Sequence, residues 1–289
     1  MLEMLFSPRM AKREPWTMFF IGLLYASLAI LLVKWVFAGD FVNAEYSGWI
    51  LVIFIIMFSL PFMYYLIRDE EARDMNEEGS LRLLKEHAHA LFSLMWLFLG
   101  FIVALSFWYI AFGPNHLFDA QIKTYCSINN PTNFDSCVSD YGIKSADKTT
   151  GMITSSITTK DRFLLIFTNN IYVLIFTLVF SLIFGAGALF ILAWNASVIA
   201  AAIGIFSRDN ISQLPLGVAR YMIHGSFEIG AYFIGALAGG IVSIAIIKHD
   251  TRSEKFWSVL QDSLNLIIIA VVILIVAAFV EVFITPILF

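Results

Sequence analysis

Residues 162–206 read RFLLIFTNNIYVLIFTLVFSLIFGAGALFILAWNASVIAAAIGIF, an apolar run with almost no polar loop inside it. As one α-helix the run would be about 67 Å long at 1.5 Å per residue, roughly twice the hydrocarbon thickness of a bilayer. The chain must therefore turn back, and we expect the turn at Gly185 and Gly187. Two arrangements satisfy this requirement: two full membrane spans joined by a tight turn, or a re-entrant hairpin.

The composition extends this interpretation to the whole chain. Of its 289 residues, 60% are hydrophobic and 14% charged, against about 25% charged in typical soluble proteins. Seven apolar stretches are long enough to span, approximately 16–38, 48–67, 90–112, 162–184, 186–206, 216–247 and 260–285. We therefore predict an all-α fold, a polytopic integral membrane helical bundle of about seven spans, with the lipid bilayer as its immediate partner.

The distribution of Lys and Arg predicts how this bundle is oriented in the cell membrane. Basic residues cluster before the first stretch, between the second and third, and between the last two, as at Arg13, Arg68 and Arg252. Positive residues accumulate in cytoplasmic loops, so we expect a cytoplasmic N-terminus, an extracytoplasmic C-terminus and an external loop at 113–161. The net charge of -4 offers no basic field for nucleic acid, which we exclude as a partner.

The external loop carries both cysteines, Cys126 and Cys137. An oxidising compartment favours a disulfide between them, although spacing alone does not exclude two free thiols. The loop is also longer than most unstructured connections, and such loops often have a function. We expect it to dock an extracytoplasmic protein partner. The chain then divides into an N-terminal three-span region (1–112), the external loop (113–161) and a C-terminal membrane domain (162–289).

Polar residues recur within the apolar run at helical spacing. Asn170, Thr177, Ser181 and Gly185 follow one another at seven, four and four residues, which places them on one face of a helix. Asn169 lies beside this face, and Asn195 stands in the second half of the run. Amides in membrane helices commonly bridge neighbouring helices, so we expect these to contribute to a buried polar site.

A second polar stripe begins at His224 and continues through Glu228, Ala231, Gly235 and Gly239, which step by four, three, four and four residues. Its small residues let another helix approach closely, from the same chain or from a second copy in a homodimer. A helix starting near Pro215 would place Glu228 about 18 Å into the membrane. A carboxylate at that depth costs about 2.5–3.5 kcal/mol, so it should be protonated, paired with His224 or solvated in a cavity.

Three interpretations of this site remain open. The pair could fix helix packing together with Asn170 and Asn195, or it could relay protons or pass a solute. It could also supply two metal ligands, His224 and Glu228, to a hydrolase, but catalytic zinc usually needs three protein ligands. Only amide side chains and Glu281 remain as candidates for a third metal ligand. The sequence also contains no HExxH or GxSxG motif. We assign no metal or cofactor, and a non-enzymatic role is favoured.

The order of these features resembles the stage II sporulation protein M family over about residues 160–285. The resemblance rests on Asn169-Asn170, the glycines at 185 and 187, Asn195, His224-Gly225 with Glu228, and the glycine-rich tail at 235–240. Family members usually carry Asn-Gly where this chain has Asn195-Ala196. The resemblance implies a membrane scaffold that recruits extracytoplasmic or envelope partners. A transporter of an ion, proton or small solute is the alternative, and an intramembrane metal-dependent hydrolase is the second.

Overall fold

The computed structural model describes nine segments of the chain: 14–37, 46–74, 88–113, 116–129, 133–140, 159–184, 188–208, 210–248 and 254–289. Every regular element within these segments is helical. The long helices are α2 (Thr17–Phe37), α4 (Ser47–Asp74), α6 (Ala88–Phe112), α9 (Thr159–Phe184), α10 (Ala188–Phe206), α11 (Leu214–Lys248) and α12 (Glu254–Phe279). The predicted all-α membrane bundle is confirmed.

Six of these helices are long and apolar enough to cross a membrane: α2, α6, α9, α10, α11 and α12 together with its continuation. The apolar part of α4 among the described residues is Ser47–Phe62, which is shorter than the six candidate spans. Helices α9 and α10 each qualify separately, which favours two full spans over a re-entrant hairpin. Gly185 and Gly187, where we expected the turn, lie outside the described residues.

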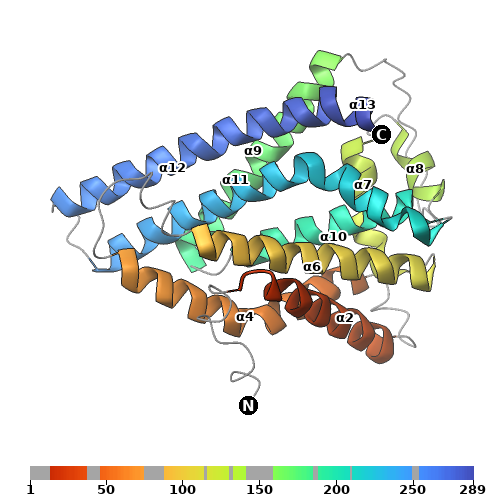
Figure 1. The fold of residues 1–289 in the computed structure, drawn as a ribbon, viewed down its shortest axis with the longest axis horizontal. Coiled ribbons are helices and arrows are strands. Elements are labelled where there is room, and N and C mark those ends of the chain that lie inside the picture. The colour runs from red at the N-terminus through yellow and green to blue at the C-terminus, as the bar shows by residue number, and fades with distance from the viewer. Residues whose placement is uncertain are drawn as a thin grey trace.

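Most of the long helices run roughly along the long axis of the molecule, and α9 passes obliquely behind them (Figure 1). Helix α10 packs against α6, α11, α9 and α4 and thereby joins two groups, α2–α4–α6 and α9–α11–α12. Its buried face is built from alanines, including Ala196, Ala200 and Ala201, none of which is exposed. Small side chains allow helices to pack closely where hydrophobic burial gives no driving force between them.

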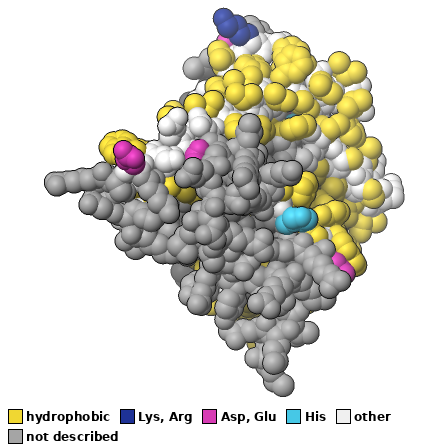
Figure 2. Space-filling model, turned by 60° about the vertical axis from the view of Figure 1, so that its left-hand side comes forward, with side chains coloured by type: hydrophobic (Ala, Val, Ile, Leu, Met, Phe, Trp, Pro, Cys, Tyr) yellow, Lys and Arg dark blue, Asp and Glu magenta, His cyan; other side chains and the backbone are white. Residues whose placement is uncertain are grey.

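The outer surface of the bundle is apolar, as expected for a protein solvated by lipid. Large hydrophobic side chains are exposed along α9, such as Tyr172 and Phe176, and along α12, such as Ile268 and Val272. Figure 2 shows hydrophobic side chains as a broad field on one face, with the charged side chains at its margins. Exposed apolar surface on this scale would be a liability in water, and it fits the expected bilayer environment.

Helices α2 and α6 cross at two glycines, which the sequence analysis did not single out. A Cβ atom added at Gly22 would collide with the Leu97 carbonyl oxygen, and one at Gly100 would collide with the Phe19 carbonyl oxygen. The two backbones are therefore in direct contact at this crossing. Only glycine permits so close an approach.

The region predicted as an external loop contains folded elements at one end of the bundle. It contributes η2 (His116–Phe118), α7 (Asp119–Asn129) and α8 (Phe134–Asp140), which we call the cap. The structure pairs Cys126 on α7 with Cys137 on α8 in a disulfide, with Cα atoms 5.8 Å apart. The cap and the C-terminus lie at the same end of the molecule (Figure 1).

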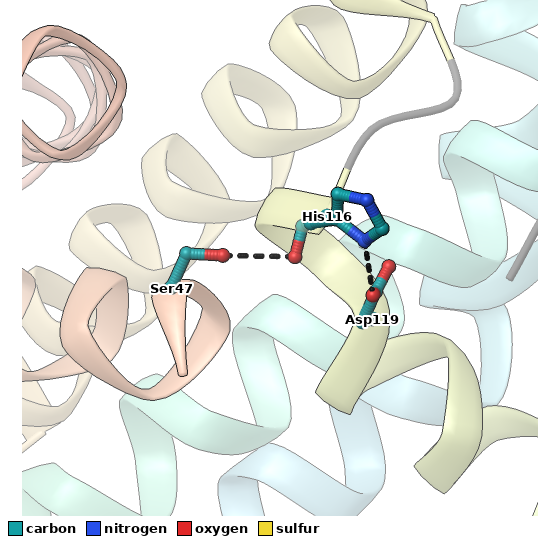
Figure 3. Close-up of polar contacts among 3 residues, drawn as sticks. All are labelled: Ser47, His116 and Asp119. Carbon is teal, nitrogen blue, oxygen red and sulfur yellow. Dashed lines mark hydrogen bonds and ion pairs between the residues drawn. The ribbon is translucent and has the colours of Figure 1, made fainter. Parts of the chain in front are cut away.

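Polar contacts attach the cap to the start of α4. The Ser47 hydroxyl donates to the His116 carbonyl oxygen at 2.8 Å, and His116 Nδ1 lies 2.8 Å from Asp119 Oδ2 (Figure 3). The buried side chain of Gln121 donates from Nε2 to the Gly48 carbonyl oxygen at 3.0 Å and to Ser197 Oγ at 3.2 Å. Ser47 therefore holds the backbone of His116, and Asp119 holds its ring.

Candidate functional site

The central acid of the bundle is Glu228, on α11. It follows Leu214, the first residue of this 35-residue helix, by about 21 Å at 1.5 Å per residue, which places it near the middle of the helix. Its Oε1 accepts a hydrogen bond from Asn170 Nδ2 on α9 at 2.6 Å. Asn170 is only 5% exposed. The sequence predicts these two side chains in one site, and the structure brings them into contact.

Tyr232 extends this contact into a short chain of hydrogen bonds. Its hydroxyl donates to Asn170 Oδ1 at 3.0 Å, and its side chain is 2% exposed. The amide of Asn170 therefore accepts a hydrogen bond from Tyr232 at Oδ1 and donates one to Glu228 from Nδ2. In this orientation both the oxygen and the nitrogen of the amide have a partner. Tyr232 and Glu228 are four residues apart, so they lie on the same face of α11. The chain of bonds runs from Tyr232 through Asn170 to Glu228.

His224 lies one turn before Glu228 and has a different partner. Its Nδ1 is 3.4 Å from the Thr285 hydroxyl, which also donates to the Val280 carbonyl oxygen at 3.2 Å. Which of the two groups donates in this contact depends on the tautomer of His224. Within the described part of the chain, His224 and Glu228 do not hydrogen-bond to each other. The His–Glu pair considered from the sequence is replaced by two separate contacts.

A second acid, Glu281, belongs to the same region. It lies in a π-helical turn, η5 (Val280–Ile284), that continues α12. Its carboxyl group is within electrostatic range of Glu228 on α11, and the Arg162 guanidinium on α9 is within range of Glu281. Arg220 is similarly close to His224. The two acids thus interact electrostatically with each other and with Arg162, while His224 interacts with Arg220.

The π-helical turn has a physical cause in Pro286, which follows it in α13 (Thr285–Leu288). Proline cannot donate a backbone hydrogen bond, and in an α-helix its ring would clash with the carbonyl four residues earlier, here that of Val282. The backbone N–H of Thr285 instead reaches the Val280 carbonyl, five residues earlier. The wider turn changes the helix register at Glu281 and Thr285. Such turns occur frequently at functional sites.

Three residues of the polar face predicted on α9 are buried, and the fourth, Gly185, lies outside the described residues. Asn170, Thr177 and Ser181 are 5%, 0% and 2% exposed, respectively. The Ser181 hydroxyl donates to the Ala236 carbonyl oxygen of α11 at 2.5 Å, so the face is directed at α11. Asn169, the neighbour of Asn170, is half-buried on the same helix.

The small-residue stripe of α11 is covered by α9 of the same chain. A Cβ atom at Gly235 would collide with the Leu174 side chain, and one at Gly239 would lie 2.6 Å from the Leu178 carbonyl oxygen. Ala231 on the same stripe is fully buried. The stripe therefore serves packing within one chain, and a homodimer remains a proposal that would need another surface.

Asn195 is not joined to this site by a hydrogen bond. Its amide nitrogen donates to the Ile191 carbonyl oxygen of its own helix, α10, at 2.8 Å.

The metal alternative also finds no support in the geometry. In the segments that the structure describes, no group of three or more His, Cys, Asp or Glu side chains could hold a metal ion. Among the described residues, His224 and Glu228 therefore have no third His, Cys, Asp or Glu beside them to complete a zinc site of the usual kind.

The sequence patterns above do not predict Tyr232 and Thr285 as site residues, and they indicate Glu281 only as a candidate metal ligand. Each had a detectable signal. Tyr232 follows Glu228 by four residues, and Thr285 follows Glu281 by four, the spacing of neighbours on a helix. The proline at 286 was the signal for an irregular turn. Arg162 stands at the start of the apolar stretch 162–184, and a cation at a helix end can reach a nearby acid.

Comparison with known proteins agrees with the sequence resemblance. The sequence profile of the family described as stage II sporulation protein M matches residues 50–286. An uncharacterized protein of Methanocaldococcus jannaschii is 33% identical over 124 residues, 42% of this chain and 69% of that protein. No solved structure matches the chain. The family match begins well before residue 160 and includes α4, α6 and the cap, which the motifs had left out. This chain belongs to the stage II sporulation protein M family.

Proposed function

We propose that this integral membrane protein carries protons across the membrane through the site formed by Glu228 and Glu281. The observation that supports this most is the hydrogen bond from Asn170 to Glu228 in the middle of α11, with a second acid in electrostatic range. The expected scaffold role does not require any acid at this depth. A proton path does, because it needs groups that take up and release protons inside the membrane.

The energetic argument concerns charge. One carboxylate at the centre of a bilayer costs about 2.5–3.5 kcal/mol on the insertion scale, and an amide or a hydroxyl could bridge the same helices without that cost. Two ionised carboxylates in range of each other add Coulomb repulsion in a medium of low dielectric constant. A proton bound by either acid removes this repulsion. The pair is therefore suited to binding a proton that arrives and releasing it again.

The surrounding groups provide partners on the side of the site nearer the cap. His224 and Thr285 are in contact there, and Arg220 and Arg162 lie within electrostatic range of His224 and Glu281. By the charge distribution of the loops, we propose that this end is extracytoplasmic.

Proton flux in sealed proteoliposomes tests the proposal. The full chain is reconstituted with a pH-sensitive dye inside, and a potassium diffusion potential is imposed with valinomycin. We expect wild-type protein to acidify or alkalinise the lumen according to the sign of the potential. Glu228→Gln, which keeps the shape of the side chain but removes its titratable group, should reduce the flux to that of protein-free liposomes.

The matched control is Glu254→Gln, at the exposed start of α12. It removes one acid from the same bundle and should leave the flux unchanged. Thermal unfolding of each purified variant checks that it is folded. Wild-type flux in a folded Glu228→Gln variant would reject the proposal and leave the acid with a structural role.

The scaffold role remains as a second candidate, and the cap is the observation that favours it. Helices α7 and α8 are folded, tied by the Cys126–Cys137 disulfide and attached to α4, so they present a defined surface to a partner protein. A photo-crosslinking residue at the exposed Asp135 should then capture one partner reproducibly, and Glu228→Gln should not change the yield. Loss of crosslinking in the Glu228→Gln variant would count against independent roles for the cap and the site.

A further inference from the structure

We infer that Arg162, at the start of α9, is a positioning residue that keeps Glu281 ionised and thereby directs the exchanged proton to Glu228. The role of that proton in transport rests on the proposed function. The pairing of Arg162 with Glu281 rests on separate observations, namely the packing of α9 against the end of α12 and the different partners of the two acids.

A small apolar cluster fixes the start of α9 against the end of α12. Ile166 on α9 is 7% exposed and packs with Ala278 and Val282, which are 0% and 8% exposed. Phe163 and Phe167 are packed against the same cluster. The first turns of α9 are therefore held beside the π-helical turn that continues α12 (Figure 1).

Helical spacing places Arg162 and Glu281 at this junction. Arg162 precedes Ile166 by four residues and so lies on the same face of α9, one turn nearer its start. Glu281 follows Ala278 by three residues and directly precedes Val282. Arg162 is exposed, so its guanidinium stays charged while its long side chain reaches inward. The electrostatic interaction between the two groups agrees with this placement.

The groups that act on Glu281 come from α9 and α11. Arg162 on α9 is a permanent cation. From α11, Glu228 and Tyr232 interact electrostatically with Glu281, and His224 contacts the residue that directly follows the π-helical turn. Of these four groups, only Arg162 is positively charged over the whole range in which carboxyl groups titrate. Arg162 is therefore the group that offsets the negative charge of Glu281.

The two acids differ in their immediate partners. Glu281 has the Arg162 guanidinium within electrostatic range, whereas Glu228 is hydrogen-bonded to the neutral amide of Asn170. A nearby positive charge favours the ionised form of a carboxyl group, and a nearby negative charge disfavours it. When the pair holds one proton, that proton therefore lies on Glu228. Asn170 Nδ2 occupies Oε1 of Glu228, which leaves Oε2 to carry the proton.

Infrared difference spectra of the full chain in proteoliposomes test this assignment. They are recorded at a pH at which the wild type shows the C=O band of protonated Glu228. We expect Arg162→Gln to gain a C=O band that the wild type lacks, because Glu281 without its cation takes up a proton. That band should be missing from the double variant Arg162→Gln/Glu281→Gln, which assigns it to Glu281.

Two matched variants separate the charge of Arg162 from its bulk. Arg162→Lys keeps the positive charge and should keep the wild-type spectrum. Lys160→Gln removes a cation two residues earlier, on a different side of α9, and should also keep it. Thermal unfolding of each purified variant checks that it is folded. A purely structural role of Arg162 would change thermal stability without adding a carboxyl band.

Proton flux provides the second readout. In Arg162→Gln we expect flux to fall about tenfold, because loss of a neighbouring opposite charge commonly changes the proton affinity of a carboxyl group by at least that factor. Arg162→Lys should restore the flux, and Lys160→Gln should leave it at the wild-type level.

Two results would overturn the inference. One is a folded Arg162→Gln variant with the wild-type carboxyl spectrum. The other needs no change at Arg162: loss of the wild-type C=O band in Glu281→Gln alone would place the proton on Glu281.

These outcomes separate the role of Arg162 from the proposed function. A Glu281 band in Arg162→Gln combined with wild-type flux in Glu228→Gln would retain the pairing and reject proton transport. Lost flux in Glu228→Gln combined with an unchanged spectrum in Arg162→Gln would retain transport and reject this role of Arg162.

Discussion

Asn170 on α9 donates a hydrogen bond to Glu228 on α11 across 2.6 Å, in the middle of the longest helix described. The contact combines two roles. It joins two helices whose backbones already approach closely at Gly239, and it orients the carboxyl group that we propose to carry protons. A change at Asn170 should therefore affect both helix packing and proton flux, whereas changes elsewhere should separate them.

Asn170→Leu removes this contact while keeping a similar volume. Glu228 Oε1 and the Tyr232 hydroxyl would both lose their partner, and we expect a loss of about 1–2 kcal/mol in unfolding free energy. Chemical denaturation in detergent micelles measures the loss. In a double-mutant cycle with Tyr232→Phe, the two losses should be less than additive because both variants break the same chain of bonds. Full additivity would show that Tyr232 and Asn170 act independently.

Gly239→Ala tests the packing of α9 against α11. The added methyl group would press on the Leu178 carbonyl and on Ser181, so we expect destabilisation of about 1–3 kcal/mol, the usual cost of overpacking. Gly230→Ala, on the same helix, is the control because a Cβ there meets no atom within 4 Å. Melting temperatures of the two purified variants give the comparison. Equal melting temperatures would mean that the helices separate easily at Gly239.

Pro286→Ala tests whether the π-helical turn positions the second acid. With a backbone donor restored at residue 286, α-helical bonding can resume, and removal of the wider turn would rotate Glu281 by about 100° relative to the residues after it. We expect proton flux to fall while thermal stability is kept. Pro61→Ala in α4 also removes a proline from a helix interior, but away from the site, and should leave flux unchanged. If both variants keep full flux, the turn has no role in transport.

The double variant Cys126→Ser/Cys137→Ser tests the cap. The disulfide spans 11 positions of sequence, and closing a loop of that length contributes about 2–3 kcal/mol in the chain-entropy description. We expect the cap to become more sensitive to protease, while flux through Glu228 stays at the wild-type level. Protease digestion with and without reductant gives the measurement. Lost flux in this variant would link the cap to the transport site.

Much of this architecture follows from local sequence patterns. The long apolar stretches predict the spans because a helix must satisfy its own backbone in lipid. The spacing of Asn170, Thr177 and Ser181 predicts a buried face because 3.6 residues per turn keep these side chains together. The placement of Asn170 against Glu228 also follows once α9 and α11 are recognised as neighbours.

Other features depend on tertiary geometry that no local pattern encodes. Asn195 has the same chemical character as Asn170 but bonds to its own helix, and only the rotation of α10 within the bundle decides this. His224 contacts Thr285, which directly follows the π-helical turn and lies 61 residues away in sequence, so no local pattern links the two. The Gly22–Gly100 crossing joins residues far apart in sequence, so neither glycine carries a signal by itself.

The most direct measurement of the central claim follows the proton on Glu228 itself. Infrared difference spectra of the reconstituted protein, recorded over a pH titration, report the C=O stretch of protonated carboxyl groups. We predict a band that appears and disappears with pH in the wild type and is missing from Glu228→Gln. A carboxyl band that does not change with pH, or identical difference spectra for the two proteins, would contradict the proposal that Glu228 carries protons.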